Sequence, residues 1–223
     1  MVLHAAYSQV GDQEQFYSIL TSLISYLCRQ KNLISQMRSQ APTVADTHWE
    51  SMGGVVGWFK QHCVDIIAYL VEKKMPACNP PKQWWIELMV ITVFAAQATT
   101  TFKQLQGNHI MVGAQWVSIN QLCQCCREDL SVIGPLAEDD TNALDLLAWV
   151  FSEDCSFAVA LSSADLYIRC QGSFVLDKIS EVEQNLYVKS VKGVAQFYVK
   201  IVSGLDNIVA QRDSNNEADE QLP

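Results

Sequence analysis

The fold of this chain is decided by its longest apolar run, Trp84-Trp-Ile-Glu-Leu-Met-Val-Ile-Thr-Val-Phe-Ala-Ala96. The run is shorter than the roughly 20 apolar residues that a transmembrane helix needs. Glu87 interrupts it, and Gln97 and three threonines follow it closely. We therefore expect a helix that is buried in the core of the protein.

Helical spacing of apolar residues continues on both sides of this run. Thr47 and Glu50 have the spacing of a capping box, Pro81 suits the first turn of a helix, and Gly134-Pro135 ends one. No stretch is convincing as a strand, and no internal repeat is present. The sequence predicts an all-α bundle of long antiparallel helices, with helices over 12–39, 48–74, 81–106, 114–133 and 176–210.

The domain organisation follows from the same pattern and from the charges. Shorter helices are predicted over 141–152 and 155–170. Residues 211–223 lack periodicity and hold four acids, which is typical of a disordered tail. The predicted parts are a helical half at 1–133, an acidic linker at 134–140, C-terminal helices at 141–210 that pack on the first half, and the tail at 211–223.

Composition and charge exclude several classes of protein. The chain has 223 residues, of which 49 % are hydrophobic and 17 % charged, so it buries a core and is not intrinsically disordered. Residues 1–130 hold nine acids and nine bases, whereas residues 131–223 hold fifteen acids and six bases. Phosphate would be repelled by the second half, so any nucleic-acid surface is expected in the first half.

The eight cysteines indicate a compartment for the protein. Most of them lie inside apolar helical patterns, where a free thiol behaves as a small hydrophobic side chain. The N-terminus lacks the pattern of a secretory signal peptide. We therefore expect reduced thiols in the nucleus or cytoplasm, and no secretion.

No constellation of residues forms a complete metal or nucleophile site. Cys123-Gln-Cys125-Cys126 supplies three thiols on one predicted helix, whereas structural zinc needs four ligands, usually in two separated pairs. We therefore expect these thiols to be buried in the core and not to bind a metal ion. His62 and Cys63 are adjacent on a helix and point about 100° apart, so they are not expected to pair.

The remaining acids also lack a catalytic pattern. Glu128-Asp129 and Asp139-Asp140 are predicted to be solvated, and no glycine-rich phosphate loop is present. We therefore expect no enzymatic activity, no metal and no cofactor.

The tryptophans divide into two groups. Five fall within helical periods and are expected in the core; they are Trp58, Trp84, Trp85, Trp116 and Trp149. Trp49 lies instead in the first turn of a predicted helix. Its ring either packs on the helix start or projects outward as a stacking platform for a base.

Three stretches carry a family resemblance: residues 16–34, Thr47-His-Trp-Glu-Ser-Met52 and Asp213-Ser-Asn-Asn-Glu217. They resemble transposase-derived proteins of the hAT superfamily. In that family a Thr-Arg-Trp-x-Ser motif opens a helical domain inserted into an RNase H-like catalytic core. The resemblance implies that this chain corresponds to the inserted domain and that Trp49 stacks on a flipped base.

The chain departs from the family pattern in two ways. His48 replaces the motif arginine and lacks its permanent charge. No residue of the chain matches the two aspartates and the glutamate of the family's catalytic core. Without these acids there is no site for the metal ions of phosphodiester chemistry.

These observations leave two functional hypotheses. The first is a non-catalytic fragment or domesticated derivative of a hAT-like transposase, which contacts DNA weakly or binds other transposase-derived proteins. Its expected DNA-binding residues are His48, Trp49, Arg38 and Lys60. The alternative is a helical scaffold for protein–protein interaction or self-association with no nucleic-acid role. Neither a membrane nor a small-molecule substrate is expected.

The location of apolar surface discriminates the two hypotheses. A groove near Trp49 flanked by Lys60, Arg29 and Arg38 favours the transposase-derived function. An uncharged apolar patch elsewhere favours the scaffold.

Overall fold

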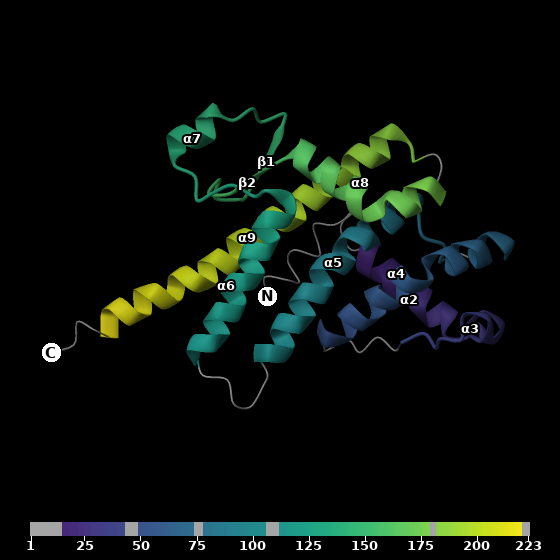
Figure 1. The fold of residues 1–223 in the computed structure, drawn as a ribbon. Helices are drawn as coiled ribbons and strands as arrows, with labels where there is room; N and C mark the ends of the chain where they lie inside the picture. The colour runs from purple at the N-terminus through teal and green to yellow at the C-terminus, as the bar shows by residue number, and fades with distance from the viewer. Residues whose placement is uncertain (1–14, 43–48, 74–77, 106–111, 179–181, 220–223) are drawn as a thin grey trace.

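The computed structural model describes residues 15–42, 49–73, 78–105, 112–178 and 182–219, and these ranges are mostly helical (Figure 1). A two-stranded antiparallel hairpin is the one sheet in the described ranges. The predicted all-α class is therefore confirmed. The elements are α2 (Gln15–Leu27), α3 (Lys31–Met37), α4 (Trp49–Glu72), α5 (Lys82–Leu105), α6 (Val112–Leu130), α7 (Glu138–Ala143), β1 (Trp149–Phe151), β2 (Ala158–Ala160), α8 (Leu161–Lys178) and α9 (Gln184–Asp219).

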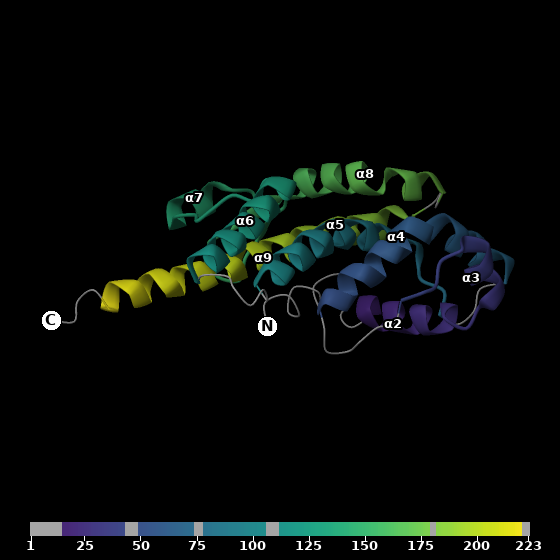
Figure 2. The same ribbon diagram turned by 60° about the horizontal axis from the view of Figure 1, so that its bottom comes forward.

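Helix α5 is the centre of the molecule. It contacts α4 on one side and α6, α8 and α9 on the other, and it lies between them in Figures 1 and 2. Thirteen of its 24 residues are buried. The expectation of a buried core helix is confirmed, because neighbours cover α5 around most of its circumference.

The first turns of α5 pack into an aromatic cluster. The Trp84 ring stacks on Phe16 of α2 at 5.4 Å between centroids and meets Phe59 of α4 edge-on at 5.8 Å. The Trp84 indole N–H donates to the Phe16 carbonyl at 3.2 Å. This bond satisfies the only polar atom of a fully buried side chain, so the cluster joins three helices.

The C-terminal part of α5 approaches α4 closely. A Cβ at Gly53 of α4 would overlap the Thr99 side chain of α5. Glycine is therefore required here by the distance between the two helices.

The opposite side of α5 packs on α9. Phe94 meets Phe197 edge-on at 5.3 Å between centroids. Glu87, which interrupts the apolar run, accepts a hydrogen bond from the Ser190 hydroxyl at 3.2 Å, and both residues are buried. The carboxylate thus has a partner inside the core.

Among the described helices, α5 is the one that is long and apolar enough to cross a membrane. Its most apolar window is 67 % buried inside the fold. A core helix of this composition passes the same test of length and hydropathy.

Two predicted helices begin or end differently. The helix predicted over 12–39 is divided into α2 and α3, because Arg29 and Gln30 donate to carbonyls three residues earlier and close a turn. The turn lets Leu33 of α3 reach the core beside α4. The helix predicted from residue 176 begins instead at Gln184, because α8 extends to Lys178.

The prediction for the C-terminal tail also differs from the structure. Helix α9 continues to Asp219, so the disordered tail predicted from residue 211 is wrong up to that residue. Adding residues to an existing helix avoids the cost of nucleation, so a polar segment can continue one. Figure 2 shows this end of α9 extending beyond the other helices.

The segment 134–160 differs most from the sequence prediction. Helices were expected over 141–152 and 155–170, whereas the structure has α7, then the β1–β2 hairpin, then α8. The runs Trp149–Phe151 and Ala158–Ala160 are too short to distinguish strand from helix by periodicity. The predicted linker 134–140 ends inside α7, whose first turn holds Glu138, Asp139 and Asp140, where acids favour a helix.

The core tryptophans are partly as predicted. Trp58, Trp84 and Trp85 are buried, as expected. Trp116 and Trp149 are only half-buried, so the prediction is wrong for these two. Trp149 belongs to the hairpin, which is covered less completely than the helical bundle.

Candidate interaction surface

Residues 131–160, which we call the hairpin lobe, contain α7, β1 and β2. In both views the lobe lies at the other side of the molecule from α2 and α3 (Figures 1 and 2). The lobe has two segments, residues 131–136 and residues 152–160, which are joined by backbone hydrogen bonds. Ile133 and Ala158 form an antiparallel bridge, and the Leu136 N–H donates to the Ser156 carbonyl at 2.8 Å. The strands β1 and β2 of the lobe pair with each other in antiparallel fashion.

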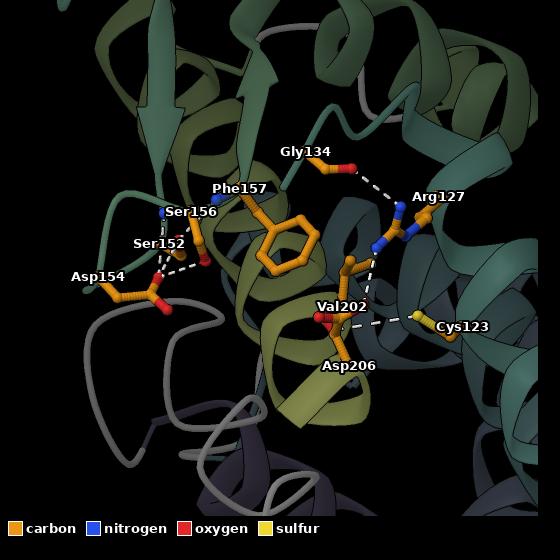
Figure 3. Close-up of polar contacts among 9 residues, drawn as sticks. All are labelled: Cys123, Arg127, Gly134, Ser152, Asp154, Ser156, Phe157, Val202 and Asp206. Carbon is orange, nitrogen blue, oxygen red and sulfur yellow. Dashed lines mark hydrogen bonds and ion pairs between the residues drawn. The ribbon is translucent and has the colours of Figure 1, made fainter. Parts of the chain in front are cut away.

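Arg127 in the last turn of α6 attaches the lobe to the bundle (Figure 3). Its Nη1 donates to the Gly134 carbonyl at 3.0 Å, and its Nη2 donates to Asp206 Oδ1 of α9 at 2.9 Å. The guanidinium carbon lies 5.0 Å from the centroid of the Phe157 ring. One side chain thus joins α6, α9 and both segments of the lobe.

Gly134 allows the two segments to lie in contact. Its φ is +132°, a backbone conformation that favours glycine. A Cβ there would overlap the Ser156 carbonyl and the Phe157 ring. A side chain at residue 134 would therefore push the segment away from Arg127.

The loop between β1 and β2 is built around Asp154 (Figure 3). Asp154 Oδ1 accepts hydrogen bonds from the Ser152 hydroxyl at 2.6 Å, the Ser156 hydroxyl at 2.7 Å and the Ser156 N–H at 3.1 Å. The serine hydroxyls hold the pKa of Asp154 below its ordinary value. The Ser152 hydroxyl oxygen in turn accepts from the Phe157 N–H at 2.9 Å.

The turn between α7 and β1 carries the most exposed large apolar side chains of the described chain. Leu146 is 75 % exposed and Leu147 is 87 % exposed. Asp145 orders this turn: its Oδ1 accepts from the Leu147 N–H at 2.9 Å, and its carbonyl accepts from the Ala148 N–H at 2.9 Å. We call residues 144–148 the leucine turn.

The lobe is also strongly acidic. It holds six acids and no lysine, arginine or histidine; all six acids are exposed, and they are Glu138, Asp139, Asp140, Asp145, Glu153 and Asp154. Glu153 pairs with Lys200 of α9 at 2.9 Å. The three acids of α7 have no ion pair within the described residues. Exposed leucines and unpaired carboxylates therefore occur on one small unit.

The predicted DNA-binding residues are placed only in part. His48 lies outside the described residues. Trp49 begins α4, but its side chain is outside the described part of the structure as well. Arg38 is exposed at the C-terminal end of α3, and Lys60 is half-buried on α4.

The predicted basic groove stays a prediction, and of its residues the structure relates Arg29 and Arg38 through their neighbours in the chain. Gln30, next to Arg29, accepts a hydrogen bond from Tyr69 of α4, whereas Ser39, next to Arg38, accepts one from Trp58 of α4. Tyr69 and Trp58 are eleven residues apart on α4, which is about 16 Å along a helix. The backbones of the two arginines therefore flank opposite ends of α3.

The cysteine cluster is mainly structural. Cys123 and Cys126 are buried, as predicted, whereas Cys125 is exposed. Burial raises the pKa of both buried thiols, which disfavours the reactive thiolate. No group of three or more metal-binding side chains occurs within the described residues.

His62 and Cys63 are both buried on α4. The His62 ring lies 5.4 Å from the Trp58 ring between centroids, and its Nε2 has no partner within the described structure. Packing against Trp58 is therefore the role that the geometry gives to His62.

The acidic pairs behave differently from one another. Asp139 and Asp140 are exposed, as predicted. Asp129 is half-buried between helices and accepts a hydrogen bond from Gln97 at 3.4 Å, so its predicted solvation is wrong. Burial raises the pKa of Asp129 above its ordinary value.

The leucine turn was missed by the sequence analysis, because Leu146 and Leu147 lie inside the helix predicted over 141–152. One signal was present in the sequence. No basic residue occurs between Arg127 and Arg169, although nine acids do. Such a segment is unusual inside a folded domain and indicates a surface with a single sign of charge.

Comparison with known protein families, curated proteins and solved structures finds no match for this chain. The hAT resemblance therefore stays a prediction.

Proposed function

We propose that this chain is a helical interaction scaffold, in which the bundle around α5 presents the hairpin lobe to another protein. The leucine turn is the observation that carries the proposal. Two adjacent leucines remain 75 % and 87 % exposed, more than any other large apolar side chain of the described residues, of which the next is Leu166 at 64 %. Covering one leucine fully is worth about 1.5–3 kcal/mol, so the pair favours association.

The order of the turn supports the same function. Asp145 fixes the backbone at Leu147 and Ala148, and Arg127 holds the lobe on α6 and α9. A surface that is already ordered loses less conformational entropy when a partner binds.

The location of the patch also favours the scaffold over the DNA-binding alternative. The leucine turn, between α7 and β1, lies away from α2 and α3 (Figure 1), and Arg29 and Arg38 of the predicted groove adjoin α3 in the chain. An uncharged patch was expected for a scaffold, whereas the leucine turn contains the exposed Asp145 and follows the three exposed acids of α7 in the chain.

Selection from a displayed library of random peptides tests this function. The bait is the full chain, and the comparison bait carries Leu146→Ser and Leu147→Ser. The control bait carries Val64→Ser and Val71→Ser, which remove two exposed apolar side chains from α4. We expect enriched peptides that bind the unmodified and control proteins and lose about tenfold in affinity for the leucine variant.

Recovery of no peptide that depends on the leucine pair contradicts the scaffold function of the lobe. The transposase-derived function has a separate test. It predicts that Trp49→Ala weakens binding of hairpin DNA by about 1–3 kcal/mol without lowering the melting temperature.

A further inference from the structure

We propose that the hairpin lobe binds a basic amphipathic segment of a different protein. Apolar side chains of that segment would cover Leu146 and Leu147, and its lysines or arginines would lie against the acids of α7. The inference rests on the scaffold function proposed above and specifies the chemistry of the partner.

Charge complementarity is the first argument. Six exposed acids and no base lie within the 30 residues of the lobe. Glu138, Asp139 and Asp140 have no ion pair within the described residues. Charges separated by less than the Debye length of about 8 Å act together at physiological salt. Glu138, Asp139 and Asp140 are consecutive in the chain, so a cationic segment is attracted to these three together and gains unpaired carboxylates there.

The same charges exclude other occupants. A second copy of the lobe would bring six further acids against the first six, so pairing of two lobes is opposed by repulsion. Nucleic acids and anionic membranes carry phosphates and are repelled in the same way. A cationic protein segment is the class of partner that the potential favours.

The arrangement of apolar side chains is the second argument. Leu146 and Leu147 are adjacent, and Ala143 and Ala148 beside them are exposed as well. The three acids of α7 lie six to eight residues before Leu146 in the chain. A partner that meets both features needs apolar and basic side chains on adjoining faces, which is the pattern of an amphipathic basic helix.

Synthetic peptides test the inference against the full chain. The probe is a fluorescent helical peptide of about 18 residues, five turns, built from leucine and lysine with one apolar face. A peptide with glutamate in place of every lysine tests the charge, and a scrambled peptide of the same composition tests the apolar face. Binding is measured by fluorescence anisotropy at about 0.05 and 0.2 M salt.

Variants of the chain separate specific binding from attraction to any acidic protein. Asp139→Asn and Asp140→Asn together remove two charges from the lobe. Asp65→Asn and Glu72→Gln remove two exposed charges from α4 and serve as the matched control. We expect the lysine peptide to bind about tenfold tighter than either other peptide, and the lobe charge variant to lose about threefold in affinity. The Leu146→Ser and Leu147→Ser protein should lose about tenfold, whereas the α4 control keeps its affinity.

Equal binding of the lysine peptide to the lobe and α4 charge variants overturns the inference, as does equal binding of the glutamate peptide. Dimers that Leu146→Ser and Leu147→Ser dissociate would show that a second copy occupies the lobe, and they overturn it too. Displayed peptides that need the leucine pair but carry no excess of lysine or arginine refute the basic partner and leave the scaffold function standing. The absence of any such peptide refutes the function itself.

Discussion

Helix α5 buries 13 of its 24 residues, whereas the 30-residue lobe buries five, namely Val132, Ser152, Phe157, Ala158 and Val159. The bundle around α5 is therefore stabilised mainly by apolar burial, through contacts such as Trp84 on Phe16. The lobe depends on polar contacts: Arg127 with Gly134 and Asp206, and Asp154 with two serines. The comparison teaches that one chain can use its core to build a rigid body and a few polar contacts to display a surface.

The largest expected effect is in the bundle. Trp84→Ala removes a fully buried ring and its hydrogen bond to the Phe16 carbonyl. We expect the free energy of unfolding to fall by about 3–5 kcal/mol, measured by urea denaturation. Trp149→Ala in the lobe is the matched control and should cost less than half as much, because Trp149 is only half-buried. Equal losses would contradict the difference between the two regions.

The attachment of the lobe gives the next effect. Arg127→Ala removes the bonds to Gly134 and Asp206 and the contact with Phe157. Since the Arg127 side chain is only 23 % exposed, we expect a loss of about 2 kcal/mol. Arg169→Ala is the control; its pair with Asp165 is exposed to water, so its loss should change the free energy of unfolding much less than Arg127→Ala does.

Hydrogen exchange localises the effect of Arg127→Ala. The amides of Ile133 and Ala158, which pair across the lobe, should exchange faster, whereas those of α5 should change little. Faster exchange throughout α5 would show that lobe and bundle open together and would remove the distinction between them.

One carboxylate in each region should also affect the stability of the protein, with opposite dependence on pH. Burial raises the pKa of Asp129 in the bundle above 3.8, so ionisation costs stability above its folded pKa and the cost disappears when the carboxyl is protonated. Asp129→Asn should therefore stabilise the protein by about 1 kcal/mol at neutral pH, and the amide can also donate to the unpartnered Gln97 Oε1. The gain should vanish as the pH falls below the ordinary value; a gain that is independent of pH would contradict the role of charge.

In the lobe, hydrogen bonds from Ser152 and Ser156 lower the pKa of Asp154 below 3.8. The stability that they supply is present above the ordinary value and is lost as the pH falls through the folded pKa. Asp154→Asn should lower the free energy of unfolding slightly at neutral pH, because water screens this exposed carboxylate, and should not change it in strong acid. Thermal melts of Asp129→Asn and Asp154→Asn across the acidic pH range measure the change in stability that each variant causes. If both variants changed stability with the same dependence on pH, the difference between the two regions would be refuted.

The smallest expected effect is at the leucine turn. Leu146→Ser and Leu147→Ser together should change the free energy of unfolding by less than about 0.5 kcal/mol, because both side chains are exposed. Urea denaturation checks this expectation. A loss above about 1 kcal/mol would show that the leucines support the fold, and their exposure would then no longer indicate a partner.

The sequence by itself determined the helical class and the main helices of the bundle. The run from Trp84 to Ala96, the capping-box spacing of Thr47 and Glu50, and Pro81 are local signals whose effects extend over a turn or two. They predicted α4 and α5 to within one or two residues, as well as the burial of Cys123 and Cys126. Local signals suffice there because the helical period repeats along the whole element.

Only the tertiary structure decided the hairpin lobe and the surface that it carries. The strands β1 and β2 are three residues each, too short for any period to show, and they form because each pairs with the other across a turn organised by Asp154. The position of Arg127 against Gly134 and Asp206 joins residues up to 79 positions apart in the sequence. Leu146 and Leu147 have the composition of core residues, and their exposure follows from which neighbours the fold supplies. Burial belongs to the packed molecule, so the sequence pattern alone could not assign these leucines to the surface.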